Sequence, residues 1–343
     1  MAKVSCPFPM RFLFYLLLMG LTFSRADAAP WDRPPGEPST GYGSAEAEIS
    51  PGFTEYQQGS AAAGDLTWYY VPDTLKYGSN APVVIFLHGF ATLVPALYHT
   101  HIEHLVREGN IVIFPQYQKS TLAGFLSEAG LGKAADQNVW ARRAVASVNS
   151  VLAQLGAKAD LDEIYLYGHS LGGLICLAWQ ADGGVPVRAM VLSHPQVDSQ
   201  QGIPPFVKPL LHIIEIPWRD YAPAINVPVI ILNGTDDHIA PVSQSEAIMA
   251  LLTSAPSRVL YVAQHDGHGY PPLSPNHGAP LDVVWGLPPH LRIFGISGEL
   301  DALDWRYYFA ALDAVMDGWR DQLPFNMGMW SDGVPVRPVQ EFH

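Results

Sequence analysis

A serine in a glycine-rich turn is the first side chain that could do chemistry. Residues 168–173 have the sequence GHSLGG, which places Ser170 at the centre of a G-x-S-x-G pattern. The apolar segment Glu163–Tyr167 before it predicts a buried strand, and Leu174–Gln180 after it predicts a helix. A strand-to-helix turn this tight exposes the serine hydroxyl and tolerates little besides glycine at its flanks. We therefore predict that Ser170 is a nucleophile.

The chain also offers an acid and a base for this serine. A serine hydroxyl is a poor nucleophile at neutral pH, so a base must take its proton and an acid must orient that base. Asp236 and Asp237 lie in the turn after one later predicted strand, and His265 and His268 follow the next strand. His268 lies between two glycines, where the chain can bend sharply to present the ring. The order along the chain is therefore serine, acid, histidine.

A sheet must position these turns. Short runs dense in β-branched and aromatic residues alternate with helical patterns, and most runs are continuously apolar, as in parallel strands covered on both faces. The predicted strands are Leu66–Val71, Pro82–Leu87, Asn110–Phe114, Glu163–Tyr167, Val187–Leu192, Val227–Leu232 and Arg258–Ala263. The predicted helices are Pro95–Glu108, Gln137–Leu155, Ser170–Gln180, Val242–Ser254 and Leu303–Trp319. We expect an α/β fold with a mostly parallel central sheet, right-handed crossovers and helices on both faces.

Long segments rich in Gly, Pro or Ser interrupt this alternation. They are predicted as insertions at Gln118–Asp136, Pro195–Asn226 and Tyr270–Pro289, and loops of this length are usually lids or substrate walls. No repeat or linker marks a second domain, so residues 61–343 are expected to form one domain. Residues 29–60 lack periodicity and predict a loosely held lead-in.

The first 28 residues have the three-part plan of a secretory signal. Lys3 and Arg11 precede the apolar run Phe12–Phe23, and Ala26–Ala28 supplies a small-x-small cleavage site. The run is shorter than the roughly 20 apolar residues that span a bilayer. We expect cleavage after about Ala28, no stable membrane anchor, and a secreted or periplasmic mature protein.

The composition narrows the choice of partner. The chain has 343 residues, a formal net charge of −13 and only 15% charged residues. An acidic balance without runs of Lys or Arg does not attract phosphate backbones, so we expect no nucleic-acid partner. His101 and His104 share a predicted helix face without a nearby carboxylate, so we expect a solvated or partly packed face. Neither a metal nor a cofactor is predicted, and a small neutral or apolar molecule is the expected partner.

The motifs together resemble those of the α/β-hydrolase superfamily, over most of the chain from about residue 66 to 319. Residues 82–90 (PVVIFLHGF) resemble the strand and His-Gly turn that form the family's oxyanion hole. Residues 168–173 match its nucleophile elbow, and residues 234–241 (GTDDHIAP) match its acid turn. The resemblance implies a serine hydrolase with a Ser-His-Asp triad and an acyl-enzyme intermediate.

The resemblance also implies a role for particular residues. The family acid usually follows the glycine of its turn by three residues, which favours Asp237 and leaves Asp236 as the alternative. The family base follows the last strand with small neighbours, which favours His268, with His265 and then His277 as alternatives. The oxyanion donors in this family are backbone N–H groups, here those of Phe90 and Leu171.

Within the superfamily, residues 98–116 resemble the branch that holds chlorophyllases, dienelactone hydrolases, platelet-activating-factor acetylhydrolases and cutinase-like polyester hydrolases. The chain departs from each pattern. Leu171 stands where a chlorophyllase elbow would carry Arg, the disulfides common in cutinase-like enzymes are missing, and Ser170 replaces the cysteine frequent in dienelactone hydrolases. We expect a hydrolase of carboxylic esters. The alternatives are another acyl-transfer enzyme (a thioesterase, peptidase or perhydrolase) and a non-catalytic binding protein of the same fold.

Overall fold

The computed structural model describes residues 31–343 except 131–133, 202–205, 207 and 283–297. Residues from Asp32 to His343 form one compact unit. The predicted signal segment, residues 1–28, lies outside the described residues. Among the residues that are described, no helix is both long enough and apolar enough to cross a membrane.

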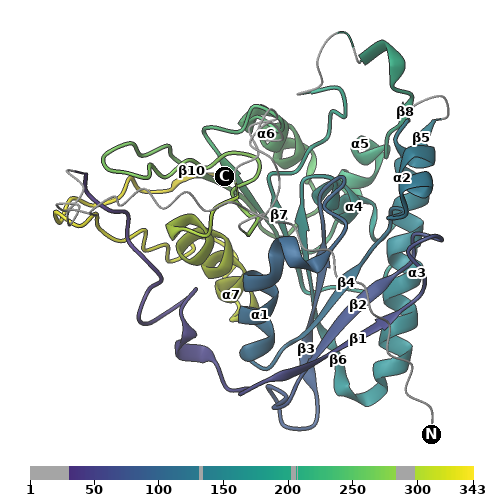
Figure 1. Ribbon diagram of the computed structural model, residues 1–343, viewed down its shortest axis with the longest axis horizontal. Helices are drawn as coiled ribbons and strands as arrows, with labels where there is room; N and C mark the ends of the chain where they lie inside the picture. Colours follow the sequence, from purple (N-terminus) through teal and green to yellow (C-terminus); the bar gives the residue numbers. More distant parts are fainter. Residues whose placement is uncertain (1–30, 131–133, 202–205, 207, 283–297) are drawn as a thin grey trace, which may run out of the picture. The chain divides into compact units, whose positions relative to one another are not determined.

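A nine-stranded sheet forms the centre of the fold (Figure 1). Its strands, in spatial order, are β1 (Phe53–Gln58), β2 (Thr67–Pro72), β4 (Ile111–Pro115), β3 (Ala81–Leu87), β6 (Ala159–His169), β7 (Ala189–Ser193), β9 (Val229–Gly234), β10 (Arg258–Ala263) and β11 (Gln340–Phe342). The strands from β4 to β10 are parallel, whereas β1, β2 and β11 pair antiparallel to their neighbours. β3, β4, β7 and β9 are buried along their whole length, which explains their continuous apolar sequences.

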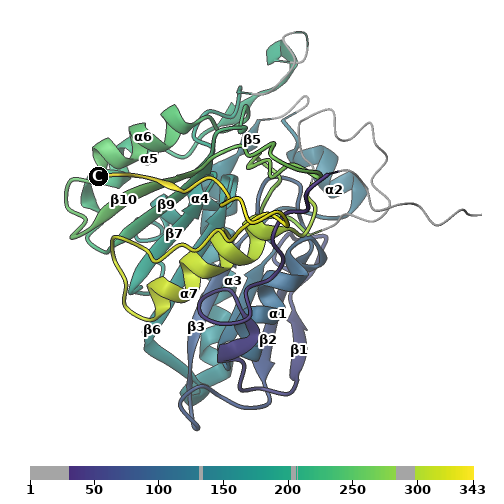
Figure 2. The same ribbon diagram turned by 90° about the vertical axis from the view of Figure 1, so that its left-hand side faces the viewer.

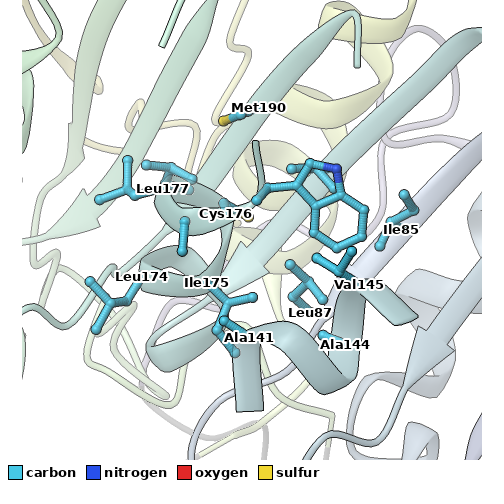
Figure 3. Packing of buried hydrophobic residues seen from close by; sticks show 14 of the residues in the cluster. Ile85, Leu87, Ala141, Ala144, Val145, Leu174, Ile175, Cys176, Leu177 and Met190 are labelled. Carbon is cyan, nitrogen blue, oxygen red and sulfur yellow. The ribbon is translucent and has the colours of Figure 1, made fainter. Parts of the chain in front are cut away.

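Helices cover both faces of this sheet (Figures 1 and 2). One face packs against α3 (Gln137–Leu155), α4 (Leu171–Ala178), α5 (Trp218–Tyr221) and α6 (Val242–Leu251). The other packs against α1 (His99–Arg107), the π-helical turn η7 (Asp304–Phe309) and α7 (Ala310–Met316). Figure 3 shows the first of these cores at α4, where Cys176 lies among Ile175, Leu177 and Met190. Cys176 is thus a buried thiol, as its place in an apolar helix suggests.

The local sequence explains the longest helix, α3. Its buried residues recur at the helical period, including Trp140, Ala144, Val148 and Val151 along one face. The Asp136 carboxylate accepts a hydrogen bond from the backbone N–H of Asn138 and thereby caps the first turn. The helix ends at Leu155, and the chain turns at Gly156, whose φ of 55° suits glycine.

The predicted α/β fold class is confirmed, and all seven predicted strands and five predicted helices form within a few residues of their expected bounds. The differences lie outside them. Residues 53–58 of the expected lead-in form strand β1, and the first insertion contains the short helix α2 (Leu122–Glu128). The two-residue strands β5 (Ala135–Asp136) and β8 (Ile213–Ile214) pair with each other. The described residues also contain five short turns of 3-10 helix: η1 (Ala45–Ala47), η2 (Pro95–Tyr98), η3 (Gly156–Lys158), η4 (Lys208–Leu210) and η5 (Ala222–Ala224).

The first helix was expected to present a solvated or partly packed face at His101 and His104, but both side chains of α1 are buried against the C-terminal helical segment. His101 stacks on Phe309. His104 Nε2 lies 2.9 Å from an Asp313 carboxylate oxygen of α7, and Glu108 lies nearby. A histidine on this face can be buried because a carboxylate from a distant helix pairs with it.

This pair makes the stability of the fold depend on pH. Burial alone would lower the pKa of His104, but the Asp313 carboxylate outweighs burial and raises that pKa to about 9. A histidine whose pKa is raised on folding stabilises fully below its unfolded pKa of about 6.5, and this stabilisation is lost as the pH rises through the folded value. We expect the melting temperature to fall between pH 6 and pH 9.5, and to fall less in His104→Gln. Equal pH slopes in the two proteins would contradict this assignment.

Candidate active site

Ser170 lies on the turn between β6 and α4. Its backbone has φ 55° and ψ −117°, a conformation that a residue with a side chain seldom adopts. The Ser170 N–H donates a hydrogen bond of 2.9 Å to the carbonyl of Ser193, at the end of the neighbouring strand β7. This hydrogen bond therefore fixes the turn to the edge of the sheet.

Two glycines make this tight turn possible. A Cβ on Gly172 would lie 2.0 Å from the carbonyl oxygen of Leu87, and a Cβ on Gly168 would lie 2.5 Å from the carbonyl oxygen of Gly172. The start of α4 therefore packs directly on the end of β3, with no room for a side chain. This is the physical reason for the glycines of the G-x-S-x-G pattern.

Gly172→Ala should consequently destabilise the fold. Because the obstructing atoms belong to the backbone, they cannot move away cheaply, and we expect a loss of at least about 2 kcal/mol in the free energy of unfolding. Gly36→Ala is the control, since a Cβ there has nothing within 4 Å. Urea denaturation of both variants measures the difference, and equal stabilities would show that α4 does not need this close approach.

His277 and Asp237 complete a hydrogen-bonded line with the serine. His277 Nε2 lies 2.8 Å from Ser170 Oγ, and His277 Nδ1 lies 2.8 Å from Asp237 Oδ2. All three residues are buried. An ionised carboxylate only accepts hydrogen bonds, so Nδ1 carries the ring proton and Nε2 is left to accept the serine proton. The arrangement can activate a hydroxyl for attack.

The surroundings of Asp237 keep its carboxylate ionised. Oδ1 accepts hydrogen bonds from the N–H groups of Ile239 and Ala240 at 2.8 and 2.7 Å, and Oδ2 accepts from the rings of His277 and His194. Burial by itself would raise the pKa of Asp237, but the hydrogen bonds from His194 and His277 outweigh it and hold the pKa well below its usual range.

The structure corrects the predicted base, because it brings His277 to Ser170 and places His268 elsewhere. His268 Nε2 lies 2.8 Å from Asp332, and the side chain is one third exposed. The path of the chain after β10 is the reason. Asp266 and Leu273 form an isolated antiparallel bridge, so the residues between them leave the sheet and return. His268 lies on this excursion, and His277 follows the return.

The alternative acid and base, Asp236 and His265, hold the loop that carries His277. Asp236 Oδ2 accepts hydrogen bonds from the Ser274 hydroxyl at 2.5 Å and from the His265 ring at 2.6 Å. The loop also passes very close to the acid turn, since a Cβ on Gly234 would lie 1.9 Å from the carbonyl oxygen of Pro275. Asp237 is thus the carboxylate that faces the histidine of the site, and Asp236 is not.

The elbow histidine joins this loop to the turn after β3. His169 Nε2 lies 2.8 Å from the carbonyl oxygen of His277, and its Nδ1 lies 2.8 Å from the Tyr98 hydroxyl. Burial, followed by the rings of His277 and His194, keeps the pKa of His169 well below its usual range. The neutral ring therefore donates from Nε2 to the carbonyl and accepts from Tyr98 at Nδ1. Tyr98 in turn accepts from the Gly89 N–H at 3.0 Å.

The predicted oxyanion donors lie beside the serine. Leu171 is the first residue of α4, and the first N–H groups of a helix have no partner within it. The turn that carries Phe90 approaches from the other side, where a Cβ on Gly89 would lie 3.3 Å from Ser170 Cβ. Within the described part of the chain, neither the Phe90 N–H nor the Leu171 N–H donates a hydrogen bond. Both N–H groups can accordingly receive an external oxygen.

Comparisons with known proteins agree with this architecture. The structure aligns with acylaminoacyl peptidase from Pyrococcus horikoshii with a TM-score of 0.51 at 14% identity, over 79% of this chain and 42% of that one. Together with the strand order and the elbow, this decides the fold. The chain has the α/β-hydrolase fold. No curated protein sequence matches the chain.

Two further similarities are more limited. A protein assigned as a dienelactone hydrolase from Klebsiella pneumoniae aligns with a TM-score of 0.44 at 18% identity, over 62% of this chain and 88% of that one. A model of the chlorophyllase family matches residues 73–187 of this chain. That region contains Ser170 and the turn of Phe90, but it ends before the acid and the histidine of the site.

Two residues of the site were missed or ranked low from the sequence. His277 lies 14 residues after β10, inside a segment expected to be an insertion, although its Asn-His-Gly context (residues 276–278) is typical of a turn. His194 directly follows the buried strand β7, at the edge of the sheet where Ser170 and Asp237 also lie. A polar residue directly after a buried parallel strand is therefore a signal by which a candidate site residue can be found from the sequence.

Three clusters of the described residues could geometrically hold a metal ion: His194 with Asp237 and His277, Asp32 with His268 and Asp332, and His104 with Glu108 and Asp313. In the first cluster each ring points a protonated Nδ1 at the carboxylate, and a nitrogen that carries a proton cannot also bind a metal. Hydrogen bonding therefore accounts for the cluster at the site.

Proposed function

We propose that this α/β-hydrolase is a serine hydrolase that cleaves carboxylic esters of small or apolar substrates through an acyl-enzyme intermediate. The observation that carries the proposal is the continuous line from Ser170 Oγ through His277 to Asp237, with both contacts at 2.8 Å. In this arrangement a serine hydroxyl, an imidazole base and an orienting carboxylate act as one unit.

The reaction runs in two halves. His277 Nε2 takes the Ser170 proton as Oγ attacks the ester carbonyl carbon, and the same nitrogen then gives that proton to the departing alcohol oxygen. The bond between the carbonyl carbon and the alcohol oxygen breaks, which leaves the acyl group on Oγ. Water, deprotonated by His277, then attacks the acyl carbon, and Oγ leaves with the proton. Asp237 keeps the proton of the ring on Nδ1 throughout.

The negative oxygen that forms at each attack requires donors that are already in place. The N–H groups of Leu171 and Phe90 supply them in this proposal, and loss of one such donor typically costs about 2.7–4 kcal/mol of transition-state stabilisation. The turn of Phe90 is held by two further contacts. Ala91 N–H donates to the Gln118 amide oxygen at 3.0 Å, and Gly89 N–H donates to Tyr98.

Apolar side chains near the Phe90 turn favour an apolar substrate. The Phe90 ring, 44% exposed, lies 5.9 Å from the ring of Phe125 and 6.0 Å from that of Trp140. Phe125 belongs to α2, whose Leu122 and Leu126 are also exposed. Exposed apolar side chains close to a candidate nucleophile are typical of a site for an apolar group. The net charge of −13 further disfavours anionic substrates.

A panel of matched aryl ester, thioester and anilide substrates with the same acyl group tests the reaction class. We expect ester hydrolysis with the largest kcat/KM, and a rise in kcat/KM as the acyl chain is lengthened from acetyl to hexanoyl. Preference for the anilide would instead favour a peptidase, and preference for the thioester a thioesterase. Purified Ser170→Ala protein supplies the blank for each substrate.

We further propose that the protein is exported, on the basis of the signal pattern in residues 1–28. Determination of the N-terminal sequence of the mature protein after expression in a secreting host tests this. A mature N-terminus near residue 29 is expected, and retention of Met1 on cell-associated protein would contradict export.

A further inference from the structure

A second histidine, His194, contacts the carboxylate of the site. His194 Nδ1 lies 2.7 Å from Asp237 Oδ2, the same oxygen that accepts from His277, and both side chains are completely buried. His194 Nε2 lies 2.7 Å from the Tyr308 hydroxyl of η7. The proposed reaction uses Ser170, His277 and Asp237, and it assigns no role to the ring of His194.

The direction of these hydrogen bonds follows from the chemistry of the groups. Asp237 is ionised and can only accept, so the proton of the His194 ring lies on Nδ1. Burial lowers the pKa of His194, although Asp237 opposes this, so the ring is neutral and its Nε2 has no proton. The Tyr308 hydroxyl must therefore donate to Nε2. Tyr308, His194, Asp237, His277 and Ser170 thus form one continuous chain of hydrogen bonds.

The backbone at His194 shows that its side chain is held at this position. Its φ of 47° lies in the left-handed region, which costs free energy for a residue that is not glycine. The N–H of His194 donates to the carbonyl of Leu232 at the end of β9, the strand that carries the acid turn. The ring is therefore fixed to the same strand pair as Asp237, and the four acceptor positions of the carboxylate are all filled.

We propose that His194 is a positioning residue of the reaction, a second imidazole that holds the Asp237 carboxylate in line with His277 and shares its negative charge. This inference rests on the proposed function of the site. By taking part of the charge on Oδ2, His194 weakens the attraction of Asp237 for a protonated His277. Without His194 the full charge of the carboxylate would act on His277, so loss of His194 should move the acid limb of activity to higher pH.

Few other titratable groups face this chain. Those that contact it or act on its members from the packed elements are His169 of the elbow, Tyr98 on the other nitrogen of His169, and Tyr307, Tyr167, Asp304 and Asp301 near Tyr308. Burial first, and nearby carboxylates second, hold the pKa of Asp304 well above its usual value. Burial also raises the pKa of Tyr308 well above its usual value. His194 is therefore the group through which the pH response of His277 can be changed selectively.

The test compares two substitutions of nearly equal shape. In His194→Asn the amide nitrogen can take the place of Nδ1 and donate to Asp237, and asparagine tolerates a positive φ. His194→Leu has the same branching without a donor, and both variants lose the contact with Tyr308. We expect the acid limb of the kcat/KM profile to move up by about one pH unit in the Leu variant, with kcat reduced at least about tenfold relative to the Asn variant.

His268→Leu is the matched control. It removes another bond from an imidazole to an aspartate, 2.8 Å long, from Asp332, which lies at the surface away from Ser170. The acid limb of this variant should stay at its wild-type position. Acid limbs that coincide in His194→Asn, His194→Leu and wild type would overturn the proposal, as would an equal shift in His268→Leu.

NMR of the wild-type protein tests the same proposal without measuring turnover and without relying on a variant that must fold. Histidine labelled with ¹⁵N reports the tautomer and charge of each ring. We expect His194 to remain a neutral Nδ1–H tautomer across the pH range in which His277 titrates. An Nε2–H tautomer, or titration of His194 together with His277, would refute the proposal. If the wild-type enzyme hydrolysed no acyl substrate at all, the proposed function would fail instead, and the NMR result would still decide the role of His194.

Discussion

Ser170→Ala should lower kcat for a short-chain aryl ester by about 10⁴- to 10⁶-fold while the protein remains folded. The substitution removes the only oxygen that forms the acyl bond, whereas the turn keeps its backbone contacts with Ser193. Some residual rate over water should persist, because the N–H donors and the binding surface remain. Steady-state kinetics and circular dichroism of the same preparation measure the two effects.

The matched control for this prediction is Ser150→Ala, which changes an exposed serine on α3. Its kcat/KM should equal that of the wild-type enzyme. A Ser170→Ala enzyme that retains more than about one tenth of the wild-type kcat would contradict the assignment of the nucleophile, since loss of a triad serine is never so mild.

His277→Ala should have nearly as large an effect, and His268→Ala almost none. Among the described residues, no side chain other than His277 contacts Ser170 Oγ to take its proton, so we expect kcat to fall by about 10⁴-fold or more. His268 contacts Asp332 at the surface, so its loss should change kcat/KM by less than about threefold.

This pair of variants distinguishes the base found in the structure, His277, from the base predicted from the sequence, His268. The two histidines are nine positions apart along the chain, and only the distances in the fold distinguish them. The reverse result, with His268→Ala inactive and His277→Ala active, would restore the base predicted from the sequence. A variant can lose activity because it unfolds or because it lacks a catalytic group. The unfolding curve of each variant should therefore be recorded beside its kinetics.

The parts of the site that the sequence predicted are those encoded locally. Ser170 is positioned by the strand before it, the helix after it and the glycines between them, all within about 20 residues. Asp237 follows its own strand directly, so a short motif suffices to find it. The parallel sheet could also be predicted, because buried strands must be apolar on both faces.

The identity of the base is encoded over a longer range. His277 reaches Ser170 because Asp266 and Leu273 bridge, because Ser274 binds Asp236, and because Gly234 leaves space for Pro275. None of these contacts has a signal in the spacing of residues after β10. A histidine between two glycines fits a sharp bend equally well, and His268 has such neighbours without facing the site.

His194 and strand β1 illustrate two other limits. The partners of His194 lie 43 and 114 positions away, so no local pattern connects them. β1 is an edge strand whose residues are mostly exposed, and its pairing with β2 gives it its conformation. Its polar sequence, FTEYQQ, therefore lacks the alternation by which a half-buried strand is found.

Reaction with a fluorophosphonate, followed by mapping of the modified peptide, tests the central claim most directly. The reagent bonds to a serine oxygen only where a base activates that oxygen. We predict a single adduct on Ser170 Oγ, formed at the wild-type rate in His268→Ala and at least about 10³-fold more slowly in His277→Ala. An adduct on a different residue, or equal labelling rates in the two histidine variants, would contradict it.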